Sequence, residues 1–375
     1  MRKERVLILR PDNIGDVVLF SGALKHLRAL YSTAHLTLAV QSHILNLVEL
    51  CPYVDSCVSV DRLSWWPRVN NIGMPFPRLF EWFIRRGNGA WNTIFGVFDT
   101  ILYPVKSPQI SHLKIVRDLR ARRTIGMTGC NVNAPVGGYP FTVQPANLFT
   151  EQIDMEESYP WRHELLTTFD FLKFLGCPVS SLREIQPQLW LNETEVDYLA
   201  EFRNGTNKII GLFPGASSLM RCWDPTNYGE FARLMGQDIL YVIFGSVLDK
   251  NLSSQVESVI RASAKCKIIN LVGRTSIREL AKSITSCDLF IGMDSSGLHL
   301  AIAQGVPTVG IIGGGHYGRF VPWGRRGGNL FITRQLDCFY CNWKCSKSRV
   351  ECIQDVESKK VAEAARHLLD AGKCI

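Results

Sequence analysis

Arg5-Val-Leu-Ile-Leu9, followed by Arg-Pro-Asp-Asn-Ile-Gly-Asp16, has the pattern of a short apolar strand that leads through a polar turn into a helix. Apolar residues then recur at helical spacing as far as Leu30, and His35–Val40 forms a second apolar run. This order of strand, helix and strand predicts a βαβ unit. The N-terminus of its helix offers unbonded N–H groups and a positive dipole end, which together attract an anion.

A second segment of this kind, Gly292-Met-Asp-Ser-Ser-Gly-Leu-His299, lies near the other end of the chain. Other apolar runs that read as strands are Thr100–Tyr103, Lys208–Phe213, Asp238–Phe244, Cys287–Gly292 and Pro307–Ile312. Strands that alternate with helices predict doubly wound parallel sheets, in which ligands bind beyond the carboxyl ends of the strands. We therefore expect an α/β protein of two Rossmann-like domains that face a central cleft.

The length of 375 residues suits two domains of ordinary size. Pro187–Leu191 resembles an interdomain passage, and Asn192 is a natural N-cap for a helix over Glu193–Arg203. We expect domains at 1–186 and 187–375, and we consider a C-terminal helix that packs back on the first domain.

Composition and charge narrow the class of protein. Hydrophobic residues make up 46% and charged residues 20%, as in a globular protein, and no apolar run is long enough to span a bilayer. The N-terminal apolar run is too short for a secretory signal, so a cytoplasmic location is expected. Residues 1–123 hold seventeen Lys and Arg against nine Asp and Glu. This basic third is either a solvated face or a surface for an anionic glycolipid or the inner membrane, and no nucleic-acid motif accompanies it.

Within this basic third, Arg120, Arg122 and Arg123 are candidate acceptor contacts, with a solvated face as the alternative. Phe76–Arg86 is a candidate amphipathic element. It would lie on a membrane surface, cover the cleft or belong to the core.

Twelve cysteines in a cytoplasmic chain predict free thiols or metal ligands. Most are scattered, but four cluster as Cys338-x2-Cys341-x3-Cys345-x6-Cys352. Four soft thiolates within fifteen residues are a candidate structural site for zinc or iron. A redox-sensitive disulfide pair and plain packing are the alternatives.

Two motif classes are missing from the sequence. A GxGxxG fingerprint followed by an acidic residue is absent, which argues against a dehydrogenase, and a GxxxxGK[ST] loop is absent, which argues against a P-loop phosphotransferase. The chemical features that the sequence still offers are a candidate general base and turns suited to phosphate binding.

Four segments in order carry a resemblance to family nine glycosyltransferases, the lipopolysaccharide heptosyltransferases. They are Arg10–Val18, Phe213–Trp223, Leu271–Ser276 and Gly292–Ala301. The resemblance implies a GT-B fold and inverting, metal-independent transfer from an ADP-sugar, usually ADP-heptose. An anionic glycolipid or core oligosaccharide is the implied acceptor.

Carried over by position, Asp16 matches the family's general base, which takes the proton of the acceptor hydroxyl; helix capping is the alternative role. Asp12 and Asn13 on the same turn are candidate acceptor contacts. The residues matched to donor diphosphate binding are Ser217, Arg221, Ser295, Ser296, Gly297 and Leu298. Asp294 matches a position that contacts the donor sugar or holds its loop. Asp249 and Thr275 are matched to the nucleoside, and His299 is given a structural role.

Three features depart from the family pattern. They are Gly313-Gly-Gly-His-Tyr-Gly-Arg319 where the family has Gly-Pro-Thr, the segment around residues 64–91, and the four-cysteine cluster. The identities of donor and acceptor therefore stay open. A protein acceptor and a non-catalytic nucleotide-sugar-binding protein are the alternative functions, although the presence of Asp16 and Arg221 argues against the latter.

Overall fold

The computed structural model describes residues 2–61, 98–119, 121–128, 148–155, 161–203, 205, 208–324 and 327–371. The chain divides into two compact units, one of residues 1–160 and 165–185 and the other of residues 161–164 and 186–375. The main division falls between Ile185 and Gln186, next to the expected boundary. The predicted amphipathic element Phe76–Arg86 lies outside the described residues.

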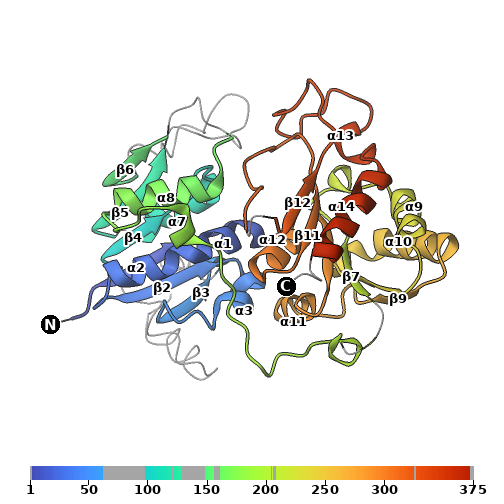
Figure 1. Ribbon diagram of the computed structural model, residues 1–375. Helices are drawn as coiled ribbons and strands as arrows, with labels where there is room; N and C mark the ends of the chain where they lie inside the picture. Colours follow the sequence, from blue (N-terminus) through green and yellow to red (C-terminus); the bar gives the residue numbers. More distant parts are fainter. Residues whose placement is uncertain are drawn as a thin grey trace, which may run out of the picture. The chain divides into compact units, whose positions relative to one another are not determined.

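The first unit is built on a sheet of six parallel strands in the order β3-β2-β1-β4-β5-β6 (Figure 1). The strands are β1 (Arg5–Leu9), β2 (His35–Val40), β3 (Ser56–Ser59), β4 (Thr100–Tyr103), β5 (Arg123–Thr128) and β6 (Glu151–Asp154). The helices are α1 (Ile14–Phe20), η1 (Ser21–Ala23), α2 (Leu24–Leu30), η2 (Ser42–Ile44), α3 (Leu45–Val48), α7 (Ile110–Leu119), α8 (Glu164–Phe174) and η4 (Leu182–Ile185). The bounds predicted for β1, β2 and β4 are confirmed, and the helix predicted as far as Leu30 is the succession α1, η1 and α2.

The second unit repeats this plan with the strand order β12-β11-β10-β7-β8-β9. The strands are β7 (Lys208–Phe213), β8 (Ile239–Ile243), β9 (Lys267–Asn270), β10 (Leu289–Met293), β11 (Thr308–Ile311) and β12 (Asn329–Ile332). The helices are η5 (Ala200–Phe202), η6 (Leu219–Arg221), α9 (Pro225–Met235), η7 (Val247–Asp249), α10 (Lys250–Ser263), α11 (Ile277–Ile284), α12 (Ser296–Ala303), α13 (Glu351–Gln354) and α14 (Ser358–Ala371). Numbered within its own unit, each sheet has the order 3-2-1-4-5-6 of doubly wound nucleotide-binding folds.

The expected helix over Glu193–Arg203 is wrong, because only η5 is helical there. The segment instead binds α11 and the turn after it through its polar groups. The Tyr198 N–H donates to Ser283 Oγ at 3.1 Å, and the Ser286 hydroxyl donates to Asp197 Oδ2 at 2.5 Å. These contacts replace helical hydrogen bonds, so tertiary packing overrides a favourable local pattern.

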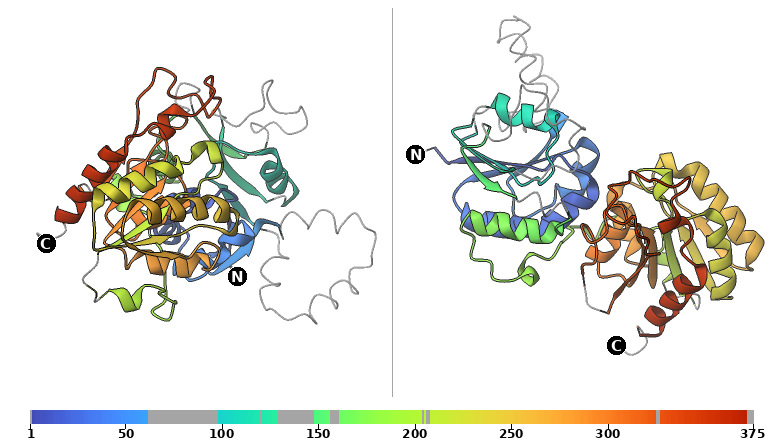
Figure 2. Two further views of the ribbon diagram at one scale, coloured as in Figure 1. Left: turned by 90° about the vertical axis from the view of Figure 1, so that its right-hand side faces the viewer. Right: turned by 90° about the horizontal axis from the view of Figure 1, so that it is seen from above.

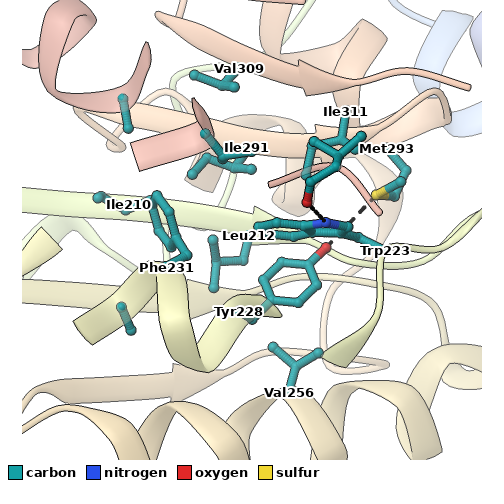
Figure 3. Packing of buried hydrophobic residues seen from close by; sticks show 14 of the residues in the cluster. Ile210, Leu212, Trp223, Tyr228, Phe231, Val256, Ile291, Met293, Val309 and Ile311 are labelled. Atoms are coloured by element: carbon teal, nitrogen blue, oxygen red, sulfur yellow. Dashed lines mark hydrogen bonds between the residues drawn. The ribbon is translucent and has the colours of Figure 1, made fainter. Parts of the chain in front are cut away.

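The core of the second unit lies on one face of its sheet, under α9, α10, α13 and α14. Figure 3 shows Trp223 at its centre, with the Tyr228 ring edge-on at a centroid distance of 4.9 Å. The Trp223 indole donates to Val356 O at 2.9 Å, and the Tyr228 hydroxyl donates to Met293 Sδ at 3.8 Å. A fully buried tryptophan thus fixes the chain two residues after Arg221.

Helix α14 covers one face of the sheet of its own unit, and its packing on the first unit stays a prediction. It packs on α9, β10, β11 and β12 of its own unit, and Val361, Ala365 and Leu368 are buried in the core there. In the left view of Figure 2, α9 and α10 lie side by side across the sheet of this unit. Among the described helices, none combines the length and apolarity that crossing a bilayer requires.

Candidate functional site

The two sheets locate a candidate site in each unit. In a sheet of order 3-2-1-4-5-6 the strand order reverses between strands 1 and 4, because later strands are added on the other side of strand 1. Ligands bind beyond the carboxyl ends of these two strands. In the first unit the reversal lies between β1 and β4, and in the second between β7 and β10. The turns after β1, β7 and β10 are those that carry the predicted site residues.

In the first unit, the turn after β1 is organised around Arg10, whose exposed fraction is 4%. Its guanidinium donates to Pro104 O, after β4, and to Asp16 O at 3.3 Å. The Nε atom lies 3.0 Å from Asp12 Oδ2, and the guanidinium stacks on the Phe20 ring at 4.9 Å. Arg10 therefore ties the two strands at the reversal point to the first turn of α1.

Asp16 lies in that first turn, half-buried, and Asn13 is the N-cap without a side-chain capping bond. Asp12 is held by Arg10. Burial lowers the pKa of His112 in α7, and the negative charge of Asp12 opposes this shift. The structure thus gathers Asp12, Asn13 and Asp16 at the carboxyl edge of the sheet. Sequence reasoning missed His112 and Lys106, which is 2% exposed just after β4.

Arg122 and Arg123 lie at the opposite edge of the same sheet. Arg123 begins β5 and pairs with Glu151 at the start of β6, with Nη2 donating to Oε2 at 2.8 Å. Arg122 and Arg123 thus lie at the amino ends of the strands, whereas Asp16 lies beyond a carboxyl end, and their acceptor role stays a prediction. Arg120 lies outside the described residues.

In the second unit, Arg221 ends η6 and reaches the turn after β10. Its Nη1 donates to Ser217 Oγ at 2.9 Å, and its Nη2 donates to Asp294 O at 2.7 Å and lies 3.5 Å from Asp294 Oδ2. Burial raises the pKa of Asp294, while the charges of Arg221 and Arg319 oppose that rise. Asp294 is 6% exposed and contacts Arg221 through its backbone carbonyl and its carboxylate.

Ser295, Ser296, Gly297 and Leu298 form the N-cap and first turn of α12. The N–H groups of a first turn have no acceptor within the helix, so they are available to an anion. Gly297 is required by packing, because a Cβ atom there would lie 2.4 Å from the Phe213 ring at the end of β7. The glycine brings the helix N-terminus close to the turn that leads to Ser217.

Several buried polar atoms around Arg221 find no hydrogen-bond partner among the described residues. They are Arg221 Nε, Ser295 Oγ, His316 Nδ1 and Trp343 Nε1. Arg221, Trp343 and His316 are in contact, since the Trp343 ring lies 4.6 Å from the guanidinium carbon and 5.8 Å from the His316 ring. Ser295 follows Asp294, whose carbonyl accepts from Arg221. Nε2 of His316 donates to Asn342 Oδ1, so His316 Nδ1 is an acceptor, and the donors in this set are Arg221 Nε, Ser295 Oγ and Trp343 Nε1. Buried donors are normally satisfied, so these three beside a helix N-terminus indicate a site for an anionic ligand.

His299 is buried beside this site. The Trp323 indole donates to His299 Nδ1 at 3.0 Å, so the ring proton lies on Nε2, and the two rings stack at 5.9 Å. Burial, with His163 and Arg221, lowers its pKa to about 3. The ring is therefore neutral, and its 4.0 Å approach to Asp294 is not an ion pair.

Asp249 is engaged within the protein. Its carboxylate accepts hydrogen bonds from the N–H and the hydroxyl of Ser246, both at 2.7 Å, in a capping box at η7. It also lies against Gly215, where a Cβ atom would meet Asp249 Oδ1 at 2.3 Å. Thr275 precedes Ser276, the N-cap of α11. Both residues lie beyond the carboxyl ends of strands, and a nucleoside contact stays a prediction for each.

The glycines that depart from the family pattern accommodate the cysteine loop. A Cβ atom on Gly314 would lie 2.3 Å from the Phe339 ring, and one on Gly315 would lie 2.4 Å from the Trp343 ring. The four clustered cysteines line one small pocket beside these glycines. Across the described residues, however, no three His, Cys, Asp or Glu side chains are arranged to hold a metal ion.

The chain has two Rossmann-like units, and each carries polar residues at the point where its strand order reverses. This architecture defines a protein of the GT-B class. The model of glycosyltransferase family 9 (heptosyltransferase) matches residues 154–346, and the chain belongs to this family. This match includes Arg221 and Asp294, whereas Asp16 lies outside it.

A curated relative, lipooligosaccharide heptosyltransferase 2 of Campylobacter jejuni, is 33% identical over 170 residues, 44% of this chain and 52% of the relative. This chain thus spans about half the length of that relative. Among solved structures, a family 9 glycosyltransferase of Veillonella parvula has a TM-score of 0.70 at 18% identity, over 98% of this chain and 97% of that one. ADP-heptose LPS heptosyltransferase II of Escherichia coli has a TM-score of 0.67 at 15% identity, covering 98% and 99%. Both likenesses show the fold.

Proposed function

We propose that this protein transfers a heptose from ADP-heptose to a hydroxyl group of a lipopolysaccharide core acceptor. Family membership supports the class of reaction. The relative from C. jejuni is a lipooligosaccharide heptosyltransferase, and the E. coli structure is named for ADP-heptose. A glycolipid acceptor would bring the protein to the cytoplasmic face of the inner membrane as a peripheral enzyme.

The observation that carries the proposal is the set of open donors around Arg221. A departing diphosphate develops negative charge, and a guanidinium, a hydroxyl and helix N-terminal amides stabilise such charge without a metal ion. Arg221 is already oriented by Ser217 and Asp294, so little reorganisation is needed when the donor binds.

In the proposed mechanism the carboxylate of Asp16 takes the proton of the acceptor hydroxyl. The acceptor oxygen forms a bond to the anomeric carbon as the bond from that carbon to the diphosphate breaks, so the configuration inverts. The proton passes to Asp16, and the electron pair of the broken bond passes to ADP. Arg10, which donates to the Asp16 carbonyl, would hold the turn in position during this step.

Thermal unfolding in the presence of a panel of nucleotide-sugars tests the donor, because a ligand of the native state raises the midpoint. We expect ADP-heptose to raise it most, with UDP-sugars ineffective. Release of ADP on addition of a core oligosaccharide then tests transfer. Stabilisation by UDP-sugars alone would contradict the donor assignment, and donor binding without ADP release would favour the non-catalytic alternative.

A further inference from the structure

His316 lies in the glycine segment that departs from the family pattern, in the turn after β11. Strand β11 pairs in parallel with β10, so this turn and the turn that holds Asp294 leave neighbouring strands at the same edge of the sheet. The Trp343 ring contacts both His316 and Arg221, at 5.8 Å from the imidazole ring and 4.6 Å from the guanidinium carbon. His316 is therefore a neighbour of the proposed diphosphate site.

One nitrogen of the His316 ring is engaged and the other is open. Nε2 donates to Asn342 Oδ1 at 2.6 Å, so the neutral ring presents Nδ1 as a hydrogen-bond acceptor. Burial lowers the pKa of the ring to about 4, although the hydrogen bond to Asn342 opposes this shift, so Nδ1 carries no proton near pH 7. Nδ1 is buried, and no donor among the described residues reaches it.

The surroundings hold the imidazole in place without satisfying Nδ1. Three aromatic rings of the second unit contact it, those of Trp161 at 5.8 Å, Phe320 at 5.7 Å and Trp343 at 5.8 Å. Gly313 and Gly315 make room for the indole, because a Cβ atom on them would lie 2.7 and 2.4 Å from the Trp343 ring. Buried polar atoms are normally paired, so a fixed acceptor without a donor beside a ligand site indicates a contact to the ligand.

The need for a donor distinguishes Nδ1 from the other open atoms. Arg221 Nε, Ser295 Oγ and Trp343 Nε1 can each donate to an ionised diphosphate oxygen, which only accepts. Such an oxygen cannot satisfy His316 Nδ1, since both atoms are acceptors. A hydroxyl group can donate to it, and hydroxyl groups are what a sugar adds to a nucleoside diphosphate.

The strand order places His316 on the sugar side of the diphosphate. In the order β12-β11-β10-β7-β8-β9, the turns assigned to the diphosphate follow β10 and β7. The predicted nucleoside contacts, Asp249 and Thr275, follow β8 and β9. A donor that lies along this edge with its nucleoside over β8 and β9 therefore has its sugar over β11, where His316 lies.

We propose that His316 Nδ1 accepts a hydrogen bond from a hydroxyl group of the transferred sugar, and that Asn342 is a positioning residue that fixes the ring for this contact. His316 is thus a specificity residue, which favours donors with a hydroxyl at that point over donors without it. The inference rests on the proposed function, because it takes the direction of the donor from the diphosphate site. The ribose of ADP and the acceptor are competing sources of a hydroxyl, and the experiment separates them.

Calorimetric titration of ADP and ADP-heptose, without acceptor, into the wild type and His316→Phe tests the contact. The phenyl ring keeps the aromatic packing and removes the acceptor. ADP-heptose should bind about three- to tenfold more weakly, the worth of one hydrogen bond between neutral groups, while ADP affinity is unchanged. His316→Asn, whose amide oxygen can replace Nδ1, should recover part of the loss. The matched control His367→Phe, at an exposed position of α14, should equal the wild type for both ligands.

Equal ADP-heptose affinity in the wild type and His316→Phe would overturn the inference. A parallel loss of ADP affinity would also overturn it, because the missing contact would then belong to the ribose, the diphosphate or the fold. A wild-type chain with no affinity for ADP-heptose would instead refute the proposed donor, and the inference would fall with it.

ADP-heptose analogues that each lack one sugar hydroxyl test the specificity on folded wild-type protein. The wild type should bind one of them about three- to tenfold more weakly than ADP-heptose, whereas His316→Phe should bind the two equally. Asn342→Ala should lose part of this discrimination, and Asn342→Asp, which keeps the accepting oxygen, should regain it. Discrimination that is the same in the wild type and His316→Phe, or absent from both, would contradict the assigned contact.

Discussion

Each unit places an arginine near the point where the strand order of its sheet reverses, but the two arginines make different polar contacts. Arg10 makes its contacts within its own unit, to two backbone carbonyls, to Asp12 and to the Phe20 ring. Neither Nε atom makes a hydrogen bond among the described residues, but Arg10 Nε lies 3.0 Å from Asp12 Oδ2, whereas Arg221 approaches Asp294 through Nη2, and Ser295 Oγ also lacks a hydrogen-bond partner there. The same fold position thus serves in one unit to fix a turn and in the other to leave donors open for a ligand.

Under the proposed function, this difference gives the two sites separate roles. The turn after β1 presents carboxylates, from Asp12 and Asp16, on a rigid support, which suits a base. The turn after β7 presents a cation and α12 presents amide groups, which suits a leaving diphosphate. The predictions below test this division.

The largest effect is expected for Asp16→Asn, which keeps the shape of the side chain and removes the base. The transfer rate should fall by about 10²–10⁴-fold, the usual contribution of a general base, while ADP affinity is retained. The matched control is Asp118→Asn, a carboxylate in α7 that pairs with its neighbour Arg117. Steady-state kinetics and ADP titration check this prediction, and a variant as active as the wild type would remove Asp16 from the mechanism.

Arg10→Met should destabilise the protein strongly because it strands the carboxylate of Asp12 and two carbonyl groups. Breaking a buried ion pair by removing one partner costs about 3–5 kcal/mol. Urea unfolding measures the loss, with Arg233→Met on the surface of α9 as the control, for which a change within about 0.5 kcal/mol is expected. Equal stabilities of the two variants would show that Arg10 does not organise the turn.

Gly297→Ala tests the close approach of α12 to β7. The added methyl group would overlap the Phe213 ring, and overpacking of this kind costs about 1–3 kcal/mol. Because the helix N-terminus must shift, ADP affinity should fall together with stability. Retained affinity in the folded variant would argue against diphosphate binding by this turn.

The most gradual effect is a dependence of stability on pH. Burial lowers the pKa of His316 to about 4, although its hydrogen bond to Asn342 opposes the shift. The unfolded chain takes up this proton near pH 6.5 and the folded chain does not, so the contribution to stability is present above pH 6.5 and is lost as pH falls toward 4.

Below pH 6.5 the free energy of unfolding should therefore decline by up to about 1.4 kcal/mol per pH unit from this residue. His316→Gln should remove that part of the slope, which urea unfolding at several pH values between 4 and 7 measures. An identical slope in the variant would show that His316 is not buried in its neutral form.

Periodicity and turn residues predicted much of this architecture. The bounds of β1 and β7 follow from apolar runs that end in polar or glycine turns, and these turns hold the candidate sites. Contacts between distant segments could not be predicted. Arg123 looked like part of a basic surface because sequence does not show that it begins β5 at the opposite edge of the sheet. The glycines at 313–315 looked like a departure near the donor, and only the structure shows Phe339 and Trp343 packed against them.

The central claim, that Arg221 binds the donor diphosphate, is tested most directly by calorimetric titration of ADP and adenosine into the wild type, Arg221→Ala and Arg233→Ala. Arg221→Ala should bind ADP about ten- to a hundredfold more weakly, the worth of charge-assisted hydrogen bonds, while its affinity for adenosine is unchanged. Arg233→Ala should match the wild type for both ligands. Equal ADP affinity in all three proteins would contradict the account.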